Sequence, residues 1–194
     1  MVVEQNCKYI QNEKEYLPGE EIPTIQIGDI YVCGDFEYKY NYKASLLNDY
    51  PWLHNEQQCG WGVRTIDKTK ESYGSILCEI NNFPVTSLHN TFYNCVNLTT
   101  APEIPHTIVD LWGTFSGCES LICSPTIPNS VQKMQWAFEY CEKLQNIPSI
   151  PSHITDLTGT FADCVSLKQI SIDSNIKTPI QKIFINCPTL KLNR

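Results

Sequence analysis

The sequence lacks the features that mark membrane and exported proteins. No stretch approaches the ~20 consecutive apolar residues of a membrane-spanning helix. The first residues also lack a basic segment followed by an apolar one, which is the pattern of a secretory signal. We therefore expect no membrane insertion and no classical secretion.

Positive charge is scarce as well. Residues 1–84 carry 7 Lys or Arg against 13 Asp or Glu, and residues 85–194 carry 7 against 8. A nucleic-acid-binding surface normally presents a basic patch or stripe, and neither part of the chain has the composition for one. We therefore expect no nucleic-acid partner.

The chain also has no recognisable catalytic or metal-binding motif. We find no nucleophile with a base at useful spacing, no phosphate-binding loop and no Cys-x-x-Cys pair. Cys118 and Cys123 are separated by four residues, but no histidine lies in a matching position. We predict a non-enzymatic protein with no catalytic residues, no metal and no cofactor. Four histidines are expected to be solvated surface residues: His54, His89, His106 and His153.

Cysteine is too infrequent for a disulfide scaffold. Ten cysteines are about 5% of the 194 residues, below the ~8–10% of such scaffolds. In the absence of a secretory signal, reduced thiols are expected.

What the sequence does contain is a repeat. A Phe is followed three residues later by Cys and after three more by Leu, five times in steps of 23 residues. The five phenylalanines are Phe92, Phe115, Phe138, Phe161 and Phe184. A fixed period of this size predicts a solenoid in which each unit packs against the next.

Each unit is predicted to contain a short helix and a short extended strand. Leu111, Phe115 and Cys118 have the i, i+4, i+7 spacing of one helix face, and the other copies repeat it. The cysteines of this stripe are interpreted as small buried residues rather than disulfide partners or metal ligands. Prolines such as Pro102 and Pro105 recur in the following stretch, so only short bridges between turns are expected there.

The two ends of the chain differ from the repeat. After the fourth Leu the prolines disappear, and residues from about 168 onward are interpreted as a C-terminal cap. Residues 25–42 alternate with period two and turn at Cys33-Gly34-Asp35, which predicts a β-hairpin. Its aromatic face either packs on the first repeat or forms an exposed binding face. The predicted domains are an N-terminal arm and hairpin cap, 1–75, with residues 1–24 as an extended arm, and the repeat solenoid, 76–194.

The repeat resembles a known family. Its unit reads Leu-x-x-Thr-Phe-x-x-Cys-x-x-Leu-x-x-x-Pro-x-Ile-Pro-x-x-Ile and is similar to the BspA-type leucine-rich repeats, common in surface and secreted proteins of gut bacteria, protists and some bacteriophages. The resemblance implies adhesion or another contact with a protein or glycan surface, without catalysis. The missing export signal and the short array depart from a surface-anchored member, and leave a cytoplasmic or virion-associated protein as the expectation.

Two functional hypotheses follow. The first is a repeat scaffold for protein or glycan recognition, either adhesin-like or a virion decoration. The alternative is a structural subunit of a phage particle or another assembly, docking through its N-terminal region and able to form a homo-oligomer.

Large aromatic side chains at nominally outward positions of the repeat are the first candidate binding residues, with packing between adjacent turns as the other interpretation. They are Tyr93, Trp112, Trp136 and Tyr140. Trp52 and Trp61, in turn-rich sequence before the repeat, are candidates of the same kind, and plugging the end of the solenoid is the other interpretation for these two.

Overall fold

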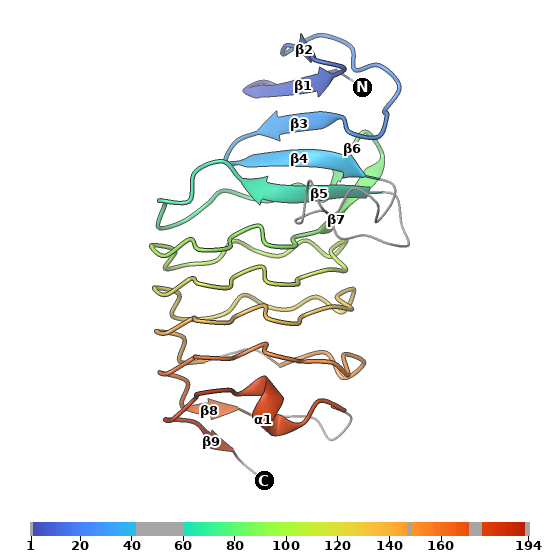
Figure 1. Cartoon of the computed structure of the whole chain (residues 1–194). Helices are drawn as coiled ribbons and strands as arrows, with labels where there is room; N and C mark the ends of the chain where they lie inside the picture. Colours follow the sequence, from blue (N-terminus) through green and yellow to red (C-terminus); the bar gives the residue numbers. More distant parts are fainter. Residues whose placement is uncertain (1, 42–59, 147–148, 171–175, 193–194) are drawn as a thin grey trace.

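The chain forms a solenoid that continues from an N-terminal sheet (Figure 1). The computed structural model describes residues 2–41, 60–146, 149–170 and 176–192. In Figure 1 the sheet lies at one end, and the coils of the repeat stack beneath it toward the C-terminus. The predicted repeat solenoid with a β-rich N-terminal cap is therefore confirmed as an architecture, whereas the domain boundary at 75/76 stays a prediction.

The N-terminal cap is a seven-stranded sheet in the order β2-β1-β3-β4-β5-β7-β6. Neighbouring strands run antiparallel, except that β5 and β7 are parallel. The strands are β1 (Cys7–Gln11), β2 (Lys14–Tyr16), β3 (Ile30–Cys33), β4 (Phe36–Asn41), β5 (Gly60–Thr65), β6 (Glu79–Ile80) and β7 (Phe83–Ser87).

The predicted hairpin is confirmed as β3 and β4. Cys33 pairs with Phe36 across a two-residue turn, in which Gly34 has a positive φ of 58°. Phe36, Tyr38 and Tyr40 are buried, and the Phe36 ring meets the Phe92 ring edge-on at 6.0 Å between centroids. The aromatic face therefore packs on the first coil of the repeat. Tyr42 lies outside the described residues.

Two expectations for the N-terminal residues are wrong. Residues 1–24 are not an extended arm, because their described part contains the edge strand β2 and its neighbour β1, which complete the sheet. The thiols are not all reduced, because Cys7 of β1 and Cys33 of β3 form a disulfide. The two cysteines are cross-strand partners with Cα atoms 4.4 Å apart, a register that the sequence alone does not reveal.

The coils are joined by backbone hydrogen bonds that repeat with the sequence period. Parallel bridges connect Thr100 with Cys123 and Cys123 with Asn146, each 23 residues apart, as the sequence predicted for the proline-containing stretch. Further parallel bridges connect Ser87 with Asp110 and Asp110 with Lys133. On the Phe side of the coil, the Phe92 N–H donates to the Thr114 carbonyl and the Phe115 N–H donates to the Ala137 carbonyl. Each coil is therefore held to the next along its edge.

The phenylalanines of the repeat form a continuous column in the core. Successive rings are 5.2, 5.3, 5.6 and 5.7 Å apart between centroids and nearly parallel. Phe92, Phe115, Phe138 and Phe161 are at most 1% exposed. Full burial of a phenylalanine stabilises a fold by about 1.5–3 kcal/mol, so each of these four buried rings contributes on that order.

The cysteines of the repeat form a second column beside the first. Cys95, Cys118, Cys141, Cys164 and Cys187 are all free thiols, as the sequence predicted. The thiol of Cys118 donates to the Phe92 carbonyl at 3.2 Å, and the thiol of Cys141 donates to the Phe115 carbonyl at 3.2 Å. Cysteine therefore fills the core and also satisfies a backbone acceptor of the preceding coil. We call the two columns together the Phe–Cys ladder.

The predicted short helix of each unit is not confirmed. In the described residues from 88 to 167, consecutive turns occupy the stretch around each Phe and no helix occurs. Across all described residues the only helix is α1 (Ile180–Ile183), before Phe184. The stripe of Leu111, Phe115 and Cys118 is nevertheless buried, because stacked turns bring the same positions inward.

The C-terminal end of the described chain carries a small parallel pair. It consists of β8 (Gln169–Ile170) and β9 (Lys191–Leu192), in the region predicted to be a cap. Within the part of the chain that the structure describes, no helix has the length and apolar character needed to cross a bilayer.

Candidate functional site

The turns of the repeat require left-handed backbone at two fixed positions. Two residues before the Phe, the positive-φ residues are Asn90 (55°), Gly113 (58°) and Gly159 (65°). Two residues after it, they are Asn94 (59°), Gly117 (76°), Asp163 (58°) and Asn186 (53°). Glycine, asparagine and aspartate are the residues that adopt this conformation at least expense, so the chemistry of both positions follows from the backbone.

The coil around Phe138 is an exception at both positions. It has Trp136 with φ 59° and Tyr140 with φ 55°, whereas the other positive-φ residues at these two positions are Gly, Asn or Asp. A bulky side chain in this region costs about 1–3 kcal/mol and persists only where the surrounding structure holds it. Strained positions of this kind concentrate at functional sites, which directs attention to this coil.

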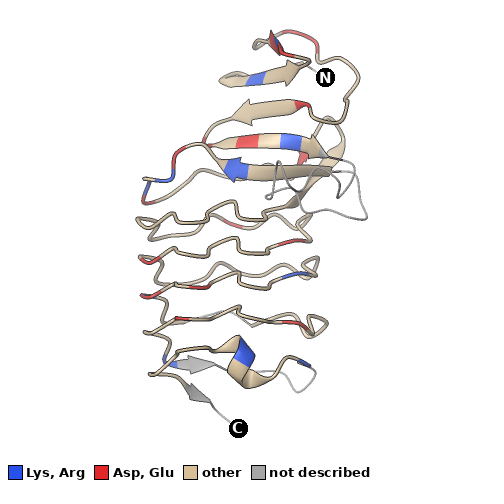
Figure 2. Cartoon of the chain, viewed as in Figure 1, with Lys and Arg blue, Asp and Glu red and all other residues tan. Residues whose placement is uncertain are grey.

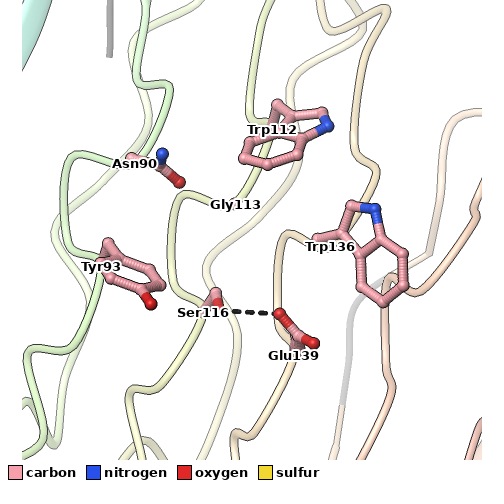
Figure 3. Close-up of a pocket in the computed structure, with 7 residues that line it drawn as sticks. All are labelled: Asn90, Tyr93, Trp112, Gly113, Ser116, Trp136 and Glu139. Carbon is pink, nitrogen blue, oxygen red and sulfur yellow. Dashed lines mark hydrogen bonds between the residues drawn. The ribbon is translucent and has the colours of Figure 1, made fainter. Parts of the chain in front are cut away.

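Trp136 lies beside a groove on the outer face of three successive coils (Figure 3). The groove has a volume of about 420 Å³. We call it the aromatic groove; its lining residues are Asn90, Tyr93, Trp112, Gly113, Ser116, Trp136 and Glu139. In Figure 3, Tyr93 lies at one end, Trp136 and Glu139 lie at the other, and Gly113 and Ser116 lie between them.

Trp112 is held in place by two buried residues, His89 and Asp110. Its indole stacks on the imidazole of His89 at 4.6 Å between centroids and 8° between planes. Its backbone N–H donates to Oδ1 of Asp110 at 2.9 Å. His89 is 5% exposed and Asp110 is 1% exposed, so the support of Trp112 belongs to the core. The expectation that His89 is a solvated surface residue is therefore wrong.

Trp136 is held by a glycine of the following coil. A Cβ atom at Gly159 would lie 2.1 Å from Cε3 and 2.3 Å from Cζ3 of the indole. Only glycine leaves room for the ring at this position, and Gly159 also has a positive φ. The indole is thus packed against the backbone of its neighbour and half-buried.

The floor of the aromatic groove combines a glycine with a polar pair. A Cβ atom at Gly113 would lie 2.2 Å from Oδ1 of Asn90. Because glycine has no side chain, the space above it belongs to the groove and Asn90 keeps its position. The hydroxyl of Ser116 donates to Oε2 of Glu139 at 3.0 Å. Among the described residues, no Lys, Arg or His forms an ion pair with Glu139.

The six predicted binding residues have different outcomes. Tyr93, Trp112 and Trp136 come together at the aromatic groove, and the sequence alone did not indicate that they share a cavity. Tyr140 is 49% exposed on the same coil as Trp136 but is not part of the lining. Trp61 is 0% exposed and donates its indole N–H to the Ile80 carbonyl, so as a surface binding residue it is wrong. Trp52 lies outside the described residues.

Elsewhere in the described residues, charged and metal-ligating side chains form no competing site. The described coils carry no continuous basic stripe (Figure 2). A group of three metal-ligating residues occurs in the described chain, namely Glu4, Cys7 and Cys33, but its two sulfur atoms are bonded to each other.

Comparisons with known proteins agree with this architecture. Residues 86–193 match the family described as "BspA type Leucine rich repeat region", in six copies, so the predicted count of five repeats is not confirmed. Among solved structures, a leucine-rich repeat protein of T. pallidum has a similar fold, with a TM-score of 0.50 and 19% identity. That match covers 72% of this chain and 60% of the other. No curated protein matches the chain.

Proposed function

Since this chain belongs to the family of BspA-type leucine-rich repeat proteins, we propose that it is a non-enzymatic scaffold that recognises another protein through the aromatic groove and the neighbouring Tyr140. Repeat solenoids of this kind present extended surfaces whose framework is separate from the residues that make contact. The framework here is the Phe–Cys ladder, and the proposed contact surface lies outside it.

The observation that carries this proposal is the strained aromatic pair. Trp136 and Tyr140 occupy backbone positions that cost free energy for large side chains, while the corresponding residues of the coil around Phe115 are Gly113 and Gly117. The indole of Trp136 packs against Gly159, but Tyr140 is 49% exposed, so packing gives no evident reason for a tyrosine at that position. Tryptophan and tyrosine are also the residues most enriched at the energetic centres of protein interfaces.

The location of the protein distinguishes an adhesin-like role from a role as a virion decoration. An adhesin-like protein contacts a cell surface, whereas a virion decoration occurs in purified particles, and proteomics of particles, culture supernatant and cell fractions separates the two. The hypothesis of a structural subunit docking through N-terminal aromatics has less support, because Tyr38, Tyr40 and Trp61 are buried within the cap.

The proposal is tested by comparing partner binding of matched variants. Immobilised wild-type protein and the Trp112→Ala and Trp136→Ala variants are incubated with proteins from the native source, and retained proteins are identified by mass spectrometry. Phe83→Ala is the control, because Phe83 is an aromatic of β7, 37% exposed and outside the aromatic groove. We expect a partner that is lost with both tryptophan variants and kept with Phe83→Ala. Full retention by folded tryptophan variants would contradict the proposal.

A further inference from the structure

The chemistry of the aromatic groove indicates which group of a partner it accepts. Its lining contains two indoles, a phenol and a carboxylate, and no Lys, Arg or His. The faces of aromatic rings attract cations, tryptophan most strongly, and a carboxylate adds a full negative charge. We propose that the aromatic groove binds an arginine side chain of the partner protein. This inference rests on the proposed function, since it names the group that the same surface recognises.

Glu139 supplies the charge for this interaction. Its carboxylate accepts one hydrogen bond, from Ser116, and has no ion pair with any described residue. An ionised carboxylate offers about four acceptor sites, so capacity remains for a bidentate guanidinium. Ser116 fixes one oxygen from the buried side and so orients the carboxylate within the groove.

The two tryptophans supply rigid surfaces for stacking. Trp112 is fixed by His89 and Asp110, and the indole of Trp136 is fixed against Gly159. A ring that is already ordered loses little conformational entropy when a ligand binds, which raises affinity. A planar guanidinium can stack on an aromatic face and also pair with a carboxylate, whereas the ammonium of lysine is compact and strongly hydrated. The arrangement therefore favours arginine.

Tyr93 at the opposite end of the aromatic groove is already near a cation of the chain itself. Nζ of Lys68 lies 5.4 Å from the centroid of the Tyr93 ring and donates to the Tyr93 carbonyl at 2.7 Å. A second cation is repelled at that end, so we assign the guanidinium to the end formed by Trp112, Trp136 and Glu139.

The test uses a charged probe and its neutral isostere. N-acetyl-arginine methylamide and N-acetyl-citrulline methylamide are each titrated into the ¹⁵N-labelled protein, and the indole N–H signals are followed by NMR. The chain has four tryptophans, and Trp112→Phe and Trp136→Phe assign the two relevant signals. We expect the arginine probe to shift both signals and the citrulline probe to bind about tenfold more weakly.

A variant of the carboxylate provides the second arm. Glu139→Gln is expected to remove most of the preference for arginine over citrulline, and Glu142→Gln, an exposed glutamate of the same coil, is expected to leave it unchanged. Equal binding of the two probes, or no shift of either indole signal with the arginine probe, would overturn the inference. If the arginine probe fails but partner capture still requires Trp112 and Trp136, this inference is wrong and the proposed function stands. If the probe binds but capture does not require them, the proposed function is wrong.

Discussion

The coil around Phe115 and the coil around Phe138 have the same interior and different exteriors. Both place a Phe and a Cys in the Phe–Cys ladder, and the centroids of the two rings are 5.3 Å apart. Both thiols donate a hydrogen bond to a backbone carbonyl of the preceding coil. Around the Phe, however, one coil reads Gly113-Thr-Phe-Ser-Gly117 and the other reads Trp136-Ala-Phe-Glu-Tyr140. The difference shows that a fixed framework tolerates an altered outer face, even where the backbone disfavours it.

The largest expected effect comes from breaking the shared interior. Phe115→Ala leaves a cavity between the rings of Phe92 and Phe138, and we expect a loss of about 3–5 kcal/mol in the free energy of unfolding. Trp112→Ala, on the outer face of the same coil, should cost less than half as much. Chemical denaturation of both variants measures the difference. Equal losses would mean that the outer-face position contributes as much to stability as the core position.

The interior is also expected to protect its thiols. Burial raises the pKa of the Cys118, Cys141 and Cys164 thiols, so they stay protonated and inert near neutral pH. Cys78 and Cys123 are exposed free thiols. In the native protein, iodoacetamide should therefore modify Cys78 and Cys123 about a hundredfold faster than Cys118, Cys141 and Cys164, as measured by peptide mass spectrometry. Comparable rates without unfolding would show that the column is open to solvent.

A glycine variant tests whether the indole of Trp136 is held as described. Gly159→Ala places a Cβ within 2.1 Å of the ring and adds a side chain at positive φ, so we expect a loss of about 2 kcal/mol. The NMR signal of the Trp136 indole should shift as the ring moves. Gly117→Ala is the control, because its Cβ meets the end of the Asn94 side chain and no indole, and it should cost only about 1 kcal/mol. A loss for Gly159→Ala no greater than this, with no shift of the indole signal, would contradict the packing.

Much of the framework could be predicted from the sequence because it is periodic. The 23-residue step specified which residues are buried, and the bridges between Ser87, Asp110 and Lys133 follow the same step. The helix was the error, because the spacing of Leu111, Phe115 and Cys118 fits a helix as well as stacked turns. The signal that separates the two is the recurrence of Gly, Asn or Asp two residues on either side of the Phe, where a helix has no need of them.

The candidate site was only partly predictable. Tyr93, Trp112 and Trp136 were selected as outward aromatics, but their meeting depends on how adjacent coils are staggered, which the sequence does not state. Trp61 was misassigned because its flanking glycines suggested a turn, whereas the residue lies in β5 between two other strands. The Cys7–Cys33 disulfide depends on strand register and left no signal in the spacing of the cysteines.

The claim that the third Phe–Cys–Leu segment keeps aromatics at the expense of stability is tested most directly by the unfolding free energy of Tyr140→Asn. Asparagine accepts a φ of 55° more readily than tyrosine, so we predict that this variant is more stable than wild type by about 1 kcal/mol. Asn94→Tyr, the reciprocal change at the equivalent position, should lose a similar amount. A loss of 1 kcal/mol or more in Tyr140→Asn would show that Tyr140 is there to stabilise the fold, and would contradict the account.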